Sequence, residues 1–193
     1  MRWVLGVVIA IAVAAGAYVW SAVASLDGLV EAARAADGAA LLARTNVSRL
    51  RHSLADQIVA AYLRRTGQDR PIKPLEQMLA NTYGSAIADA LVGKLLTEEN
   101  LTNMLSKGAI VDAGNANMPR LGQLDTSKIA EIWSRISLVK PVEFAVRLGG
   151  NEGSGAISLH FEGDGWKLSG VQLPEAAVQA LAQTLPENIG RKR

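Results

Sequence analysis

The N-terminal stretch of residues 3–24 contains no charged side chain, and residues 3–20 are almost entirely Val, Ile, Leu, Ala and Gly. At a rise of about 1.5 Å per residue, a helix of this length spans the hydrocarbon core of a bilayer, which is about 30 Å thick. A helix is expected because every backbone N–H and C=O group must find a partner within the segment once water is excluded. The stretch therefore predicts a chain that is anchored in a membrane or exported across one.

Two fates are open for the segment of residues 1–24. A retained anchor would contact the lipid bilayer through residues 3–22, whereas a signal peptide would be removed after the small-x-small motif that ends at Ala24. Signal peptides usually have an apolar region of about 7 to 15 residues behind a basic region. The run in this chain is longer and follows the single basic residue Arg2, which favours retention over secretion after cleavage.

Aromatic residues lie near both ends of the segment. Amphipathic rings are enriched at the two headgroup levels of a bilayer, and we predict these levels for Trp3 at one end and for Tyr18 and Trp20 at the other. The alternative is that the positions of these aromatic residues are incidental. Basic residues tend to stay on the cytoplasmic side, so Arg2 orients the segment. We therefore expect a single pass through the inner (plasma) membrane, with a cytoplasmic N-terminus and a periplasmic domain.

The remainder, residues 25–190, is long enough for one domain with its own core, followed by a basic tail at residues 191–193. The formal net charge is only +2, and basic and acidic residues are interleaved, so nucleic acid binding is not indicated. Three basic residues at the end can touch anionic lipid or remain solvated. The chain has no cysteine, which excludes a disulfide framework and thiolate metal sites.

Helical periodicity marks the first half of the domain. We expect helices over residues 26–36, 47–65, 75–96 and 98–107. The first either starts at a Ser25 cap or continues the membrane segment, and Asp37-Gly38 would end it. The clearest is the second, in which Leu50, Leu54, Ile58 and Tyr62 recur every fourth residue. Residues 109–124 lack periodicity and predict a long loop.

The second half changes to the alternating pattern of half-buried strands. Strands are expected over residues 132–138, 143–148, 157–162 and 166–173, with a bulge at Gly170 in the last. Gly163-Asp164-Gly165 indicates a tight hairpin, and residues 175–185 a short helix. The fold class is therefore α+β: an N-terminal transmembrane helix, a helical half packed on a four-stranded antiparallel sheet with a cleft between them, and a short C-terminal helix.

Several short motifs accompany this pattern: residues 18–21, Ala36-Asp37, Leu50-Arg51-His52-Ser53-Leu54, and Gly165-Trp166-Lys167-Leu168 with Pro174 shortly after. In these motifs, and over nearly its whole length, the chain resembles the bacterial family called domain of unknown function 2939. The resemblance implies a membrane-tethered or exported bacterial protein without assigned chemistry. It gives structural roles to the motif residues Leu50, Leu54, Trp166, Lys167, Leu168 and Pro174.

No catalytic signature accompanies these motifs. His52 and Ser53 are adjacent on one predicted helix and point about 100 degrees apart, so they do not readily adopt the attacking geometry of a hydrolase. Asp56 can meet His52 one turn away, which is equally typical of a solvated helix face. His160 lies on the polar face of its strand, and two separated histidines do not form a zinc-ligand pattern. We expect no catalytic, metal or cofactor site.

Arg49 and Arg51 are the candidate polar site. Guanidinium groups make bidentate contacts with anions, so the pair could clamp an anion; the alternative, which we favour, is that each forms a structural ion pair.

The expected function is a membrane-tethered extracytoplasmic binding module, for a small molecule in the cleft or an envelope protein on the sheet. The alternatives are a small hydrolase or isomerase acting in the cleft, and a purely structural envelope protein. An enclosed apolar cavity with convergent polar groups would favour ligand binding, whereas a filled core would favour the structural role.

Overall fold

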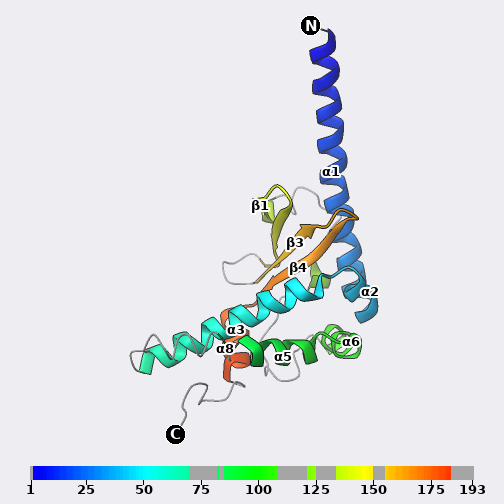
Figure 1. Cartoon of the computed structure of the whole chain (residues 1–193). Helices are drawn as coiled ribbons and strands as arrows, with labels where there is room; N and C mark the ends of the chain where they lie inside the picture. The colour runs from blue at the N-terminus through cyan, green and yellow to red at the C-terminus, as the bar shows by residue number, and fades with distance from the viewer. Residues whose placement is uncertain are drawn as a thin grey trace.

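A long N-terminal helix projects from an α+β domain in which helices cover a four-stranded sheet (Figure 1). The computed structural model describes residues 2–69, 82, 85–107, 121–124, 134–149 and 155–183. The elements in chain order are α1 (Arg2–Arg34), α2 (Gly38–Ala43), α3 (Val47–Asp69), α5 (Ser85–Leu95), α6 (Glu98–Lys107), η2 (Leu121–Gln123), β1 (Ile136–Lys140), β2 (Glu143–Arg147), β3 (Ala156–Phe161), β4 (Trp166–Gln172) and α8 (Glu175–Gln183). The α+β fold class predicted from the sequence is confirmed.

Helix α1 is one continuous helix of 33 residues. Its apolar first half is exposed, and it is long and apolar enough to cross a membrane. Its second half is part of the domain core, where Leu26, Leu29 and Val30 are at most 1% exposed. The prediction that the apolar N-terminal helix continues into the first helix of the domain is therefore confirmed, and the alternative of a helix start at Ser25 is wrong.

Helix α1 ends at Arg34, two residues earlier than the end at residue 36 that Asp37-Gly38 predicts. Asp37 N donates to Ala32 O at 2.9 Å and Ala36 N to Ala33 O at 3.2 Å, which is the hydrogen-bond pattern of a Schellman motif. The left-handed residue of this motif is Ala36, with φ of 52°. Asp37 instead caps α2, because its side chain accepts from Ala40 N at 2.8 Å.

Ala36→Gly is expected to raise the free energy of unfolding by about 0.5–1 kcal/mol, because glycine adopts positive φ without the penalty of a Cβ and loses part of that gain to its greater unfolded-state entropy. Ala40→Gly, inside α2, is the matched control and should lower stability by about 1 kcal/mol. Urea unfolding of the full chain in detergent micelles measures both variants. Equal losses in the two variants would contradict the assigned geometry at Ala36.

The helical half follows the predicted pattern with shifted ends. Helix α3 begins at Val47 as expected, capped by Asn46, whose Oδ1 accepts from Arg49 N at 2.9 Å. Of the helix predicted over 75–96, the structure describes α5, and most of residues 75–84 lie outside the described residues. Thr97 caps α6 as expected, since its Oγ1 accepts from Asn100 N at 3.3 Å.

The long loop predicted over residues 109–124 lies mostly outside the described residues. Its last part is not irregular, because η2 forms a helical turn that contacts α1. Of the C-terminal helix predicted over 175–185, α8 is described to Gln183, and the basic tail lies outside the described residues.

The sheet is an antiparallel meander with the order β1-β2-β3-β4. β1 begins at Ile136, and Ser134 and Arg135, which were expected in the strand, are helical; Ile132 and Trp133 lie outside the described residues. The predicted irregularity in the last strand is present: Ser158 pairs with Gly170 and Leu159 with Leu168, so that Ser169 is the unmatched residue. The hairpin between β3 and β4 turns at Gly163, with φ of 79°.

Two groups of buried side chains form the core. The first joins α1, α2 and one sheet face and includes Leu29, Val146 and Leu159, each fully buried. The second joins α3, α5 and α8 around Ile58 and Val92. Leu54, Leu96 and Val171 pack against both groups. The region between the two groups is therefore the place where the helices and the sheet meet.

Helix α3 runs along the edge strand β4 (Figure 1). The segment before α3 also pairs with this strand, because Leu168 N donates to Arg44 O and Asn46 N donates to Leu168 O. This pairing satisfies part of the open edge of β4 and fixes the start of α3 against the sheet.

Candidate functional site

A cavity of about 410 Å³ lies between the helices and the sheet and is partly open to solvent. Its wall is contributed by the end of α1, by α2, α3, α5, α6 and η2, and by β3, β4 and α8. The lining is almost entirely aliphatic: of the described residues that line it, only Arg34 and Gln172 have a polar side chain. This volume falls in the range of small-molecule sites, which are mostly apolar clefts of about 300–1,000 Å³.

The amphipathic stripe of α3 forms the long wall of this cavity. Leu50, Leu54 and Ile58 lie one turn apart and all line it. Opposite them are Leu168 and Val171 of β4. The same fourfold spacing that predicted the helix therefore produces a continuous apolar wall.

Two polar side chains near the cavity are fixed by backbone contacts. Arg34 donates from Nε to Gly122 O at 2.9 Å and from Nη2 to Leu124 O at 2.6 Å, which holds η2 against the end of α1. Gln57 donates to Val171 O at 2.6 Å and accepts from Leu173 N at 3.0 Å, which ties α3 to β4. No local sequence pattern marks either residue, because the distant partners are backbone groups more than 80 residues away.

Two of the sequence motifs, from opposite ends of the chain, meet at Trp166, which is 5% exposed. Its ring centroid lies 5.0 Å from that of Tyr18, 5.5 Å from Phe161 and 4.8 Å from Phe144. Trp166 Nε1 donates to Ser21 Oγ at 3.0 Å, and Ser21 Oγ donates to Tyr18 O at 2.7 Å. Motif residues 18–21 of α1 are thus joined to the start of β4, 145 residues away.

The other motif residues divide between the cavity and the surface. Leu50, Leu54, Leu168 and Pro174 line the cavity. Lys167 points to the other side of the sheet from Leu168, and its Nζ lies 3.3 Å from Asp164 Oδ2 and 3.8 Å from Glu162 Oε2.

The candidate arginines each face a different carboxylate. Arg49 Nε lies 3.8 Å from Glu162 Oε1, and Arg51 Nη1 lies 3.7 Å from Asp89 Oδ2 of α5. The structure therefore does not bring the two guanidinium groups together around one anion. Trp3 is 90% exposed and Trp20 69% exposed, whereas Tyr18 packs on the sheet. A position at the headgroups stays a prediction for all three aromatics.

A second, smaller cavity of about 260 Å³ lies on the outer face of the sheet. Its lining includes Arg49, His52, Ser53 and Glu143. The hydrogen bonds of the described residues include none between His52 and Ser53, and no described group of three His, Asp or Glu side chains is placed to hold a metal ion. The nucleophile–base contact of a hydrolase is not formed there.

Residues 11–104 match the family model described as protein of unknown function (DUF2939). This match supports the DUF2939 family over just under half of the chain. The match covers α1 from Ile11 to its end, all of α2, α3 and α5, and most of α6. This region contributes most of the helical wall of the large cavity, while the sheet wall, η2 and α8 lie outside the matched region. No curated protein and no solved structure is significantly similar to the chain.

Proposed function

We propose that this chain is a membrane-tethered module that binds an apolar molecule, such as the acyl chain of a lipid, in the cavity between its helices and its sheet. The observation that carries the proposal is the aliphatic lining of a cavity of about 410 Å³. Apolar walls favour apolar ligands because binding removes both surfaces from water.

The openness of the cavity also supports a ligand. Aliphatic side chains line a cavity that is partly open to solvent, so water would reach them in the absence of a ligand. An apolar molecule bound there would remove this surface from water, which is favourable by about 25 cal/mol per Å².

The tether part of the proposal rests on the continuity of α1. Removal of the segment at Ala24 would take away Tyr18 and Ser21, which make hydrogen bonds to Pro141 and Trp166. A retained anchor would keep both hydrogen bonds, whereas a cleaved signal peptide would remove them. We infer a single pass through the inner membrane of a bacterium, with Arg2 on the cytoplasmic side and the domain in the periplasm.

Met104→Trp tests the cavity. Met104 is a half-buried residue of α6 that lines the cavity, and an indole in its place would project into the space that a ligand would fill. We expect the wild-type full chain, released from membranes in detergent, to carry an apolar molecule that native mass spectrometry detects, and the variant to carry at least about tenfold less, a loss of about 1.4 kcal/mol in binding.

Glu99→Trp is the matched control, because it adds an indole to the exposed side of the same helix and should retain the molecule. Equal amounts of bound molecule in the two variants would place the ligand outside the cavity. A wild-type chain that carries no apolar molecule would contradict the binding proposal itself.

A further inference from the structure

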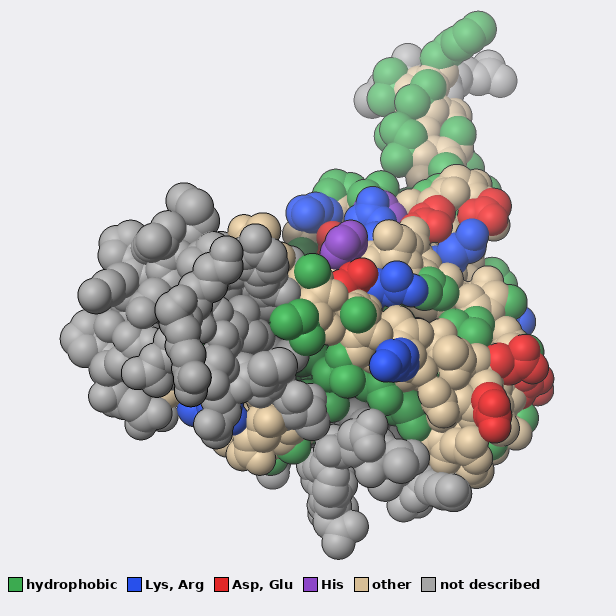
Figure 2. All heavy atoms as spheres, turned by 60° about the horizontal axis from the view of Figure 1, so that its bottom comes forward, with side chains coloured by type: hydrophobic (Ala, Val, Ile, Leu, Met, Phe, Trp, Pro, Cys, Tyr) green, Lys and Arg blue, Asp and Glu red, His purple; other side chains and the backbone are tan. Residues whose placement is uncertain are grey.

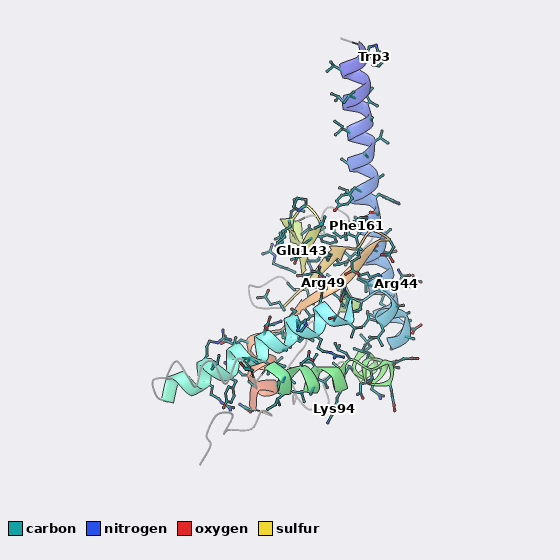
Figure 3. The ribbon with its side chains drawn as sticks, in the orientation of Figure 1. Trp3, Arg44, Arg49, Lys94, Glu143 and Phe161 are labelled. Atoms are coloured by element: carbon teal, nitrogen blue, oxygen red, sulfur yellow. The ribbon has the colours of Figure 1, made fainter. Side chains whose placement is uncertain are left out.

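The end of β1 and the turn that follows it, residues 138–142 and together called the β1–β2 turn, expose three large apolar side chains. Leu138 is 73% exposed, Val139 54% and Val142 40%. A cluster of this kind on a domain surface marks a contact with a membrane or a partner. Figure 3 shows Glu143, the residue directly after the turn, toward the end of the domain that faces Trp3, with Lys94 at the opposite end.

Hydrogen bonds hold the β1–β2 turn at the level of Tyr18. The Tyr18 hydroxyl donates to Pro141 O at 2.6 Å. Phe161 N donates to Val142 O at 2.9 Å, and the Phe161 ring lies 5.6 Å from that of Tyr18. The turn therefore has a defined height along α1.

That height lies inside the predicted span. From Trp3 to Tyr18 the helix rises by roughly 22 Å at about 1.5 Å per residue, which is less than the ~30 Å thickness of the hydrocarbon core. A bilayer that begins at Trp3 therefore extends past Tyr18 and reaches the turn beside it.

We propose that the β1–β2 turn inserts into the outer interface of the bilayer that α1 crosses, as a second lipid contact of this chain. The inference rests on the proposed membrane tether. The apolar side chains of the β1–β2 turn would lie among the upper parts of the acyl chains. Lys140, whose side chain is 67% exposed, would extend its charge to the phosphate level.

Lipid is favoured over a protein partner because exposed apolar residues of α1 lie at the level of the turn. In Figure 2 the projecting part of α1 shows hydrophobic and uncharged side chains, while the charged ones gather on the domain. Val19 and Trp20 of α1, at the level of the turn, are 40% and 69% exposed. Two lipid contacts, α1 and the β1–β2 turn, would fix the orientation of the domain on the membrane.

Single cysteines test this insertion directly, since the natural chain has none. The full chain with Val142→Cys, Val8→Cys or Lys94→Cys is labelled with an environment-sensitive nitrobenzoxadiazole dye and reconstituted in vesicles of phosphatidylcholine and phosphatidylglycerol. Some of these lipids carry a nitroxide quencher near the headgroup. Quenching is expected to be several-fold stronger at Val142→Cys than at Lys94→Cys, and Val8→Cys reports on the span.

Each other outcome has a defined meaning. Quenching at Val8→Cys without quenching at Val142→Cys overturns the turn insertion and leaves the tether intact. No quenching at Val8→Cys contradicts the tether and the inference with it. A Val142→Cys label that is shielded from water but not quenched by lipid would mean that a second copy or another protein covers the turn, which also overturns the proposal.

Discussion

Leu29→Ala is expected to lower the free energy of unfolding of the domain by about 3 kcal/mol, within the range of about 2–5 kcal/mol for buried Leu→Ala changes. Leu29 lies in the second half of α1 and is fully buried with Leu26 and Val30 against the sheet. The loss combines the missing apolar burial with the cavity that the shorter side chain leaves. Urea unfolding of the full chain in micelles, followed by near-ultraviolet circular dichroism, measures it.

Val8→Ala is the control on the same helix. Val8 is 56% exposed in the projecting half of α1, so its truncation should leave the domain transition unchanged. A Leu29→Ala variant as stable as Val8→Ala would mean that the second half of α1 does not belong to the core.

Gly38→Ala is expected to cost about 3 kcal/mol, at the upper end of the usual cost of overpacking. Gly38 starts α2 at its crossing with α6, and a Cβ there would overlap Glu98 O and lie 2.6 Å from Thr102 Oγ1 and 2.9 Å from Thr102 N. Two of these three atoms are backbone, so relief requires a shift of α6. Gly38 N also donates to Thr102 Oγ1 at 3.1 Å, and the same shift would weaken this bond.

Gly16→Ala is the matched change, because a Cβ at Gly16 would meet nothing within 4 Å. The same thermal or urea unfolding experiment should show a clear loss for Gly38→Ala and none for Gly16→Ala. Similar stabilities for both variants would show that α2 and α6 do not approach each other closely.

Periodicity predicted much of the fold because it reports which side chains face the core. Leu50, Leu54 and Ile58 recur every fourth residue and lie on the buried side of α3. Alternation predicted the meander, and Gly163 marked its last hairpin. The ends of the helices and strands were predicted less accurately. At the end of α1, for example, Ala36 adopts a left-handed conformation that is usually found at glycine.

The candidate site could not be predicted in this way, because it is built from contacts between residues far apart in the sequence. Tyr18 was expected at a membrane surface from its position near an apolar run, but its packing on Trp166 brings together residues from opposite ends of the chain. The cavity could not be distinguished from a filled core, because Leu50 and Leu54 give the same helical stripe in either case. Only the placement of α6 and α8 relative to the sheet decides between them.

We propose that α1 is one helix that both crosses the bilayer and completes the domain. The most direct test of this claim is the N-terminus of the native chain, determined by mass spectrometry of peptides from separated membrane and soluble fractions. We expect the chain in the membrane fraction, with the bond between Ala24 and Ser25 intact. A chain recovered from the soluble fraction that begins at Ser25 would contradict the claim.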